Sequence, residues 1–146
     1  MTGTELLALA EEAMTHAYAP YSHCMVGAAL LCASGSVYTG CNIENAGYSA
    51  TNCAERTAFF KAVSEGERTF SAIAVVGGKN GKIDGIFAPC GVCRQVMREF
   101  CEPESFLVLL GHRGEDGNLT YDEYTLAELL PLGFGPADVL GGDVHF

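Results

Sequence analysis

The chain has 146 residues, of which 49% are hydrophobic, and its formal net charge is −10 at pH 7. This size and composition suit a single domain over residues 1–146, and the acidic charge argues against nucleic-acid partners and anionic membrane surfaces. All eight Lys and Arg residues lie between Arg56 and Arg113, so the first 55 residues offer no fixed positive charge to a phosphate backbone. The sequence shows neither an 18-residue apolar run nor a basic leader with an apolar stretch. We therefore expect a cytoplasmic protein with reduced cysteines.

Helices and strands are predicted to alternate along the chain. Capping-box pairs, Thr2 with Glu5 and Thr125 with Glu128, mark the starts of the first and last helices, and the small residues over 33–36 predict the turn of a hairpin. In chain order, we expect a helix from Thr2 that ends before Pro20, strands over 26–32 and 37–41, a helix over 53–65, a strand over 71–76, a glycine-rich loop over 77–84, a helix over 89–100, strands over 106–110 and 119–123, a short helix from Thr125 to before Pro131, and a weakly structured tail from about 132. This order predicts an α/β protein with a three-layer α/β/α fold, and the opening hairpin makes its sheet of about five strands mixed.

Cysteines stand at the predicted starts of two helices, in Cys53-Ala54-Glu55-Arg56 and in Pro89-Cys90-Gly91-Val92-Cys93. A C-x-x-C at a helix start directs two sulfurs to one point, and Cys53 can supply the third ligand of a tetrahedral zinc site. No second C-x-x-C or H-x-x-x-H partners Cys53, which leaves the fourth position open for water, as in catalytic zinc sites. Arg56 and the two helix dipoles would compensate the charge of three thiolates.

Glu55 follows Cys53 by two residues and is well placed to exchange protons with a zinc-bound water. Three alternatives compete with this interpretation: a redox C-x-x-C with an unrelated buried thiol, a purely structural zinc, and a Glu55 that only stabilises the first helical turn. Arg56, in turn, could merely pair with a surface carboxylate. The proline before the C-x-x-C and the acid beside the third cysteine favour the catalytic site.

The Cys-Ala-Glu at 53–55, followed by Pro-Cys-x-x-Cys at 89–93, resembles the signature of the zinc nucleoside deaminases. The resemblance to the small homotetrameric cytidine deaminases extends from Ala19-Pro20-Tyr21-Ser22 through 26–29 and 40–45 to Phe134. It implies a zinc-dependent hydrolase of pyrimidine salvage, which converts free cytidine and deoxycytidine to uridine and deoxyuridine with release of ammonia. One zinc per chain would be bound by Cys53, Cys90 and Cys93, a zinc-bound hydroxide would attack C4, and Glu55 would be the proton shuttle.

The resemblance also implies roles for residues outside the cysteine motifs. Asn42 and Glu44 would hold the ribose 3′-hydroxyl, and the backbone of Ala54 would read the pyrimidine. Phe134 would reach into the active site of a neighbouring subunit, so the expected assembly is a homotetramer with the tail from about 132 in an interface. Alternatively, Asn42 and Glu44 are ordinary turn residues and Phe134 is an interface anchor. A carboxylate at the sugar opposes a phosphate there, which favours free nucleosides over nucleotides.

Cys24 departs from the family pattern, in which an aromatic Phe follows Tyr-Ser and one variable residue and packs against the base. Losing this ring removes aromatic contact of about 0.5–1.5 kcal/mol beyond area burial. We therefore expect weaker pyrimidine binding or a roomier pocket, and tighter cytidine binding by a Cys24→Phe variant.

Three other functions remain open for the whole chain. The first is deamination of a related aminopyrimidine nucleoside such as blasticidin S, because such enzymes share the metal signature. The second is a catalytically silent, zinc-stabilised interaction module, which needs a closed metal shell and no Glu55. The last is editing of RNA or DNA, which the acidic charge and the lack of a basic, aromatic-rich surface disfavour.

Overall fold

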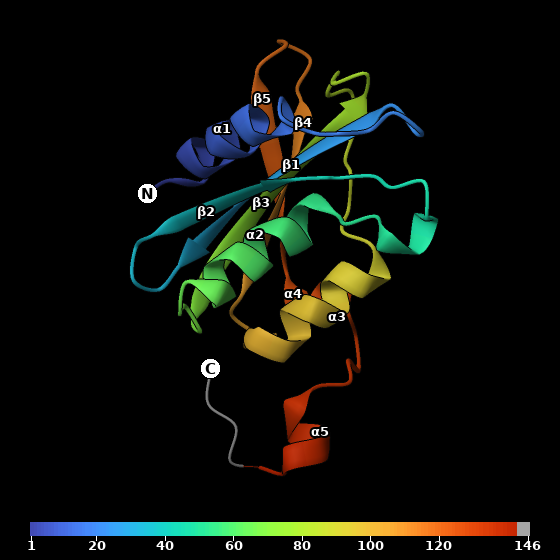
Figure 1. Cartoon of the computed structure of the whole chain (residues 1–146). Helices are drawn as coiled ribbons and strands as arrows, with labels where there is room; N and C mark the ends of the chain where they lie inside the picture. Colours follow the sequence, from blue (N-terminus) through green and yellow to red (C-terminus); the bar gives the residue numbers. More distant parts are fainter. Residues whose placement is uncertain (143–146) are drawn as a thin grey trace.

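A five-stranded sheet with the strand order β2-β1-β3-β4-β5 forms the centre of the molecule (Figure 1). The computed structural model describes residues 1–142. Neighbouring strands are antiparallel except for β3 and β4, which are parallel, so the mixed sheet expected from the sequence is confirmed. The strands are β1 (Cys24–Cys32), β2 (Val37–Cys41), β3 (Phe70–Lys79), β4 (Leu107–Arg113) and β5 (Leu119–Thr125).

Helices cover both faces of this sheet, which confirms the three-layer α/β/α fold (Figure 1). On one face, α1 packs Leu6 and Leu7 against Ala74 and Val76 of β3. On the other face, α2 and α3 enclose a core around Phe59, which is fully buried. The helices are α1 (Gly3–Met14), α2 (Ala54–Ser64), α3 (Gly91–Phe100), α4 (Leu126–Leu129) and α5 (Pro136–Leu140), with a 3-10 turn at Tyr48–Ala50.

Glycine in β2 brings the start of α2 close to the sheet. A Cβ atom on Gly40 would collide with the backbone carbonyl of Ala54 and lie 2.6 Å from the amide nitrogen of Ala58. Backbone atoms cannot rotate away from such a collision, so only glycine permits this approach. The N-terminus of α2, with Cys53 as its N-cap, is thereby fixed at the end of β2.

Two predicted boundaries between residues 14 and 77 are wrong. The first helix ends at Met14 rather than near Pro20, because the chain from Tyr18 pairs with the loop after β2: the amide of Tyr18 donates to the carbonyl of Asn42 over 3.0 Å. Gly77, predicted to begin a loop, lies inside β3, opposite Val26 of β1. The continuing backbone pairing with β1 outweighs the low strand propensity of glycine.

The chain after β3 shows two further differences. Pro89 precedes α3 instead of opening it, because Cys90 is the N-cap and Gly91 the first helical residue. The tail contains a short helix, α5, in which Asp138 accepts a hydrogen bond from the amide of Gly135 over 2.8 Å. The tail was predicted to be weakly structured, which is wrong for α5, and its last four residues, 143–146, lie outside the described part of the chain.

Candidate active site

Three cysteine sulfurs converge where α2 and α3 begin. Cys53 is the N-cap of α2, Cys90 is the N-cap of α3, and Cys93 lies in the first turn of α3. The Sγ atoms of Cys53 and Cys90 are 3.7 Å apart, and all three Sγ atoms lie within 4.8 Å of one another. Thiolates that share a tetrahedral zinc, with Zn–S distances of about 2.3 Å, stand about 3.8 Å apart. The cluster therefore fits one zinc ion with three protein ligands, as predicted.

The surroundings of the cluster favour thiolates. The guanidinium of Arg56 donates a hydrogen bond from Nη2 to the Sγ of Cys53 over 3.1 Å, and both helix N-termini add positive potential. Hydrogen bonds from Cys93, Arg56 and Cys90 lower the pKa of Cys53 to about 5 against the effect of burial. The pKa of Cys93 is raised, because its proton is held in the hydrogen bond to Cys53 and the thiol is buried. Metal binding would release this proton.

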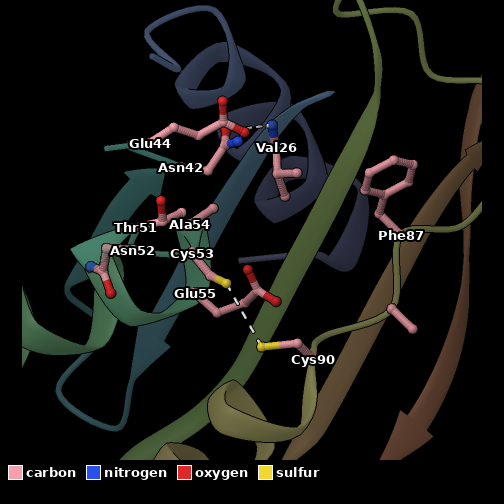
Figure 2. Close-up of a pocket in the computed structure, with 11 residues that line it drawn as sticks. Val26, Asn42, Glu44, Thr51, Asn52, Cys53, Ala54, Glu55, Phe87 and Cys90 are labelled. Atoms are coloured by element: carbon pink, nitrogen blue, oxygen red, sulfur yellow. Dashed lines mark hydrogen bonds between the residues drawn. The ribbon is translucent and has the colours of Figure 1, made fainter. Parts of the chain in front are cut away.

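A cavity of about 240 Å³ opens beside the sulfurs (Figure 2). Pockets for drug-sized ligands usually measure about 300–1,000 Å³, so this cavity suits a smaller molecule. Six of the residues predicted for the site line it, from three different parts of the chain: Asn42, Glu44, Cys53, Ala54, Glu55 and Cys90. Among the residues described here, no Lys, Arg or His joins this lining, so the cavity offers no cation to a phosphate group.

Glu55 lies in the first turn of α2 and is only 4% exposed, although it lines the cavity. Burial raises its pKa to about 7, and the nearby negative charge of Cys53 adds to the rise, while a backbone hydrogen bond opposes it. A carboxyl group with a pKa near neutrality can both take up and give away a proton at physiological pH. The side chain therefore has the burial and the proton affinity of a general acid–base.

Asn42 holds the start of β1 in place. Its Oδ1 accepts a hydrogen bond from the amide of Val26 over 2.9 Å, and its Nδ2 donates to the carbonyl of Cys24 over 2.8 Å. The side chain continues the hydrogen bonding of the sheet past the end of β2, so Asn42 has a structural function in addition to any contact with a ligand.

Glu44 is tied to the loop before β1. Its carboxylate accepts hydrogen bonds from the amides of Tyr21 and Ser22 and from the hydroxyl of Ser22. These bonds, those of Ser22 first, lower the pKa of Glu44, so it faces the cavity as a carboxylate. A carboxylate has about four acceptor positions, and three are in use here. One position remains for a ligand hydroxyl.

Five further residues line the cavity that the sequence motifs did not indicate: Val26, Thr51, Asn52, Phe87 and Ala88. Thr51 and Asn52 immediately precede Cys53, and Phe87 and Ala88 precede Cys90, so nearness to the motifs was a possible signal. Val26 comes from β1 and belongs to the stretch 26–29 that carries the family resemblance, which did not indicate that its side chain lines a cavity. Its position follows only from the pairing of β1 with β3.

A protein family described as "Cytidine and deoxycytidylate deaminase zinc-binding region" matches residues 2–109, which include all three cysteines and Glu55. The chain belongs to this family.

Its similarity to individual members covers most of the chain. The cytidine deaminase of Sporosarcina psychrophila is 49% identical over 135 residues, which are 92% of this chain and 93% of that protein. The cytidine deaminase of Halalkalibacterium halodurans is 49% identical over 136 residues, 92% of this chain and 95% of that protein. The crystal structure of cytidine deaminase from Burkholderia pseudomallei superimposes with a TM-score of 0.81 at 45% identity, covering 92% of this chain and 100% of that one.

Phe134 lies outside the part of the chain that matches the family, and the structure does not bring it into the cavity of its own chain. Its side chain is 62% exposed, and it lines a separate hollow together with Gln95 and Glu99 of α3. Its carbonyl accepts a hydrogen bond from Nε2 of Gln95 over 2.8 Å. The predicted role in a neighbouring subunit stays a prediction.

None of the helices within residues 1–142 has the length and hydropathy of a membrane span.

Without zinc and above pH 7, the Glu55→Gln protein is expected to have a higher free energy of unfolding than the unmodified chain. Burial raises the folded-state pKa of Glu55 from 4.5 to about 7, so unfolding releases a proton between these pH values and stability falls as pH rises through them. At about 1.36 kcal/mol per pH unit, the loss reaches about 3 kcal/mol, and glutamine avoids it. Urea denaturation of both proteins with a chelator, from pH 4.5 to 8, measures the effect. A stability difference that does not grow across this range would contradict the raised pKa.

Proposed function

We propose that this protein catalyses the hydrolytic deamination of free cytidine and deoxycytidine to uridine and deoxyuridine, with release of ammonia. One observation carries the proposal: the buried Glu55 lines the same small cavity as the thiols of Cys53 and Cys90. A proton-carrying group beside a cluster of metal-binding thiols is the arrangement that zinc-assisted hydrolysis requires. The relatives named cytidine deaminases support the choice of substrate.

Cys53, Cys90 and Cys93 would hold the zinc ion, which when bound lowers the pKa of a water molecule to about 7 and so supplies a nucleophile at neutral pH. Glu55 accepts a proton from the water whose oxygen adds to C4 and delivers it to ring N3. It then moves the second proton to the 4-amino group, which leaves as ammonia while the carbonyl of the uridine forms. One carboxyl group with a pKa of about 7 serves both transfers.

Asn42 and Glu44 are proposed to bind the sugar, and the backbone of Ala54 the pyrimidine. The open acceptor position of Glu44 suits a hydroxyl, whereas its negative charge repels a phosphate. Glu44 and Thr51 also line a second hollow of about 390 Å³ next to the cavity. Among residues 1–142, no Lys or Arg lines that hollow either. Free nucleosides are therefore the proposed substrates, in preference to nucleotides or nucleic acids.

The proposal includes a homotetramer in which Phe134 completes the active site of a neighbouring subunit. Exposed apolar side chains of the tail support an interface there: Leu132, Phe134, Val139 and Leu140 are between 62% and 104% exposed.

The proposal also includes a cytoplasmic location, which agrees with seven free cysteines in a reducing compartment.

The experiment that tests the proposed function is ultraviolet-monitored hydrolysis of cytidine and deoxycytidine by the purified protein, with zinc per chain measured in parallel. We expect turnover of both nucleosides, about one zinc per chain, and little turnover of deoxycytidylate. Turnover of blasticidin S without turnover of cytidine would transfer the proposal to the related aminopyrimidine nucleosides. Bound zinc without turnover of any of these compounds would contradict an enzymatic function.

A further inference from the structure

Phe87 is the sole aromatic residue among the eleven that line the cavity within the described chain. It is half-buried and lies three residues before Cys90, in the segment that leads into α3. In Figure 2 its ring stands on the opposite side of the cavity from Thr51, Asn52 and Ala54. The ring thus belongs to the same segment as a proposed zinc ligand.

Glycine in β3 makes room for this ring. A Cβ atom on Gly77 would lie 2.9 Å from Cδ2 of Phe87 and 3.0 Å from Cγ2 of Val26. These distances are shorter than ordinary van der Waals contact, so the ring of Phe87 lies over the bare backbone of Gly77 and beside Val26. Phe87 and Val26 thus lie on either side of Gly77, and both line the cavity as an apolar wall.

Cys24 adds nothing to this wall. Successive side chains of a strand alternate between its two faces, so Cys24 and Val26 of β1 point to the same face of the sheet. The side chain of Cys24 is small and does not line the cavity, whereas Val26 does. The aromatic surface of the cavity therefore comes from the segment before α3 and not from the start of β1.

The two ends of the cavity fix where a nucleoside base would lie. Cys53, Cys90 and Glu55 surround one end, and Asn42 and Glu44 stand at the other (Figure 2). A base whose C4 faces the thiols and whose sugar faces Asn42 and Glu44 spans the apolar middle section. Planar aromatic rings gain additional contact energy when they pack against each other.

We propose that Phe87 is the aromatic wall against which the pyrimidine packs and is therefore a determinant of nucleoside affinity in this chain; the inference rests on the proposed function. Phe87 binds the base and takes no part in proton transfer. A contact with the face of the ring is made before and during the reaction, so its loss should raise KM more than it lowers kcat.

The test compares Phe87→Leu with Ile86→Val in cytidine hydrolysis. Leucine keeps an apolar side chain but removes the aromatic face, so we expect KM to rise about 3- to 10-fold with kcat within about twofold. Ile86 is 41% exposed and does not line the cavity, so its variant should match the unmodified protein. Phe87→Tyr restores the aromatic face, so its KM should lie well below that of Phe87→Leu. Calorimetric titration of Glu55→Gln with cytidine, with and without Phe87→Leu, gives the affinity without turnover.

A KM for Phe87→Leu within about twofold of that for Ile86→Val would overturn the inference while the proposed function stands. Gly77→Ala provides a second variant, because its methyl group displaces the ring without removing it, and an unchanged KM there would also count against the inference. Cys24→Phe alone should leave KM unchanged, contrary to the expectation from sequence, since the wall already carries a ring; tighter binding would overturn the inference. If the unmodified chain neither binds nor hydrolyses cytidine, the proposed function fails and the inference is overturned with it.

Discussion

Glu55→Gln is expected to lower kcat for cytidine by at least about 100-fold while the protein still folds and binds zinc. The glutamine side chain has nearly the same shape and can still hydrogen-bond in the cavity, but it cannot carry a proton. Its neutral amide also suits a site that is only 4% exposed, because it has no charged form to bury. The loss should therefore appear in catalysis and not in stability.

Glu65→Gln is a suitable control for this variant. Glu65 is an exposed acid at the other end of α2, so the substitution makes the same chemical change on the same helix away from the cavity. The measurements are kcat at saturating cytidine, zinc per chain and a thermal melt for all three proteins. A folded, zinc-loaded Glu55→Gln protein with kcat within about tenfold of the unmodified chain would show that another group moves the protons. The loss of kcat in Glu55→Gln should be similar with cytidine and with deoxycytidine as substrate.

Cys93→Ala is expected to remove the zinc and to reduce deamination by more than about 100-fold, whereas Cys101→Ala keeps both. The two thiols form a matched pair, because each is 1% exposed, each lies in or directly after α3, and both belong to the same core cluster. Only Cys93 joins the sulfur cluster with Cys53 and Cys90. Two remaining thiolates leave the tetrahedral zinc shell half empty, so affinity for the metal should collapse.

The pair separates metal chemistry from packing. Replacing either buried thiol with alanine leaves a small cavity, so both variants should lose a similar amount of stability in the presence of a chelator. With zinc added, the unmodified protein and Cys101→Ala should melt at a higher temperature, since a ligand that binds only the folded state stabilises it. Cys93→Ala should show no such shift. An equal zinc content in the two variants would remove Cys93 from the proposed ligand set.

Local patterns in the sequence pointed to the residues of the metal centre. Cys90 and Cys93 are three residues apart at the start of a helix, and this spacing alone directs both sulfurs to one side of the first turn. Glu55 follows Cys53 at the start of α2, so its position relative to the Cys53 thiol is also set locally. The order of strands and helices predicted the layers for a similar reason, because hydrophobic periodicity reports directly which face of an element is buried.

Local patterns do not encode the contacts between distant segments. The sequence predicts a loop from Gly77, yet β1 continues to pair with this residue and Phe87 covers it. Asn42 was expected to bind sugar, and the structure shows that its amide group also holds the backbone of Val26 and Cys24. Each of these facts depends on two or three segments that meet only in the folded chain.

The sequence by itself was enough to predict the family, the three cysteine ligands, the role of Glu55 and the layered fold. Each of these depends on short motifs or on the periodicity of neighbouring residues. Tertiary structure decided the rest: that the thiols of α2 and α3 stand 3.7 Å apart, that Glu55 is buried enough to reach a pKa of about 7, and that the ring lining the cavity is that of Phe87, from the segment before α3. Burial and the packing of remote side chains set these properties. They arise from the close packing of elements whose mutual positions no local spacing encodes.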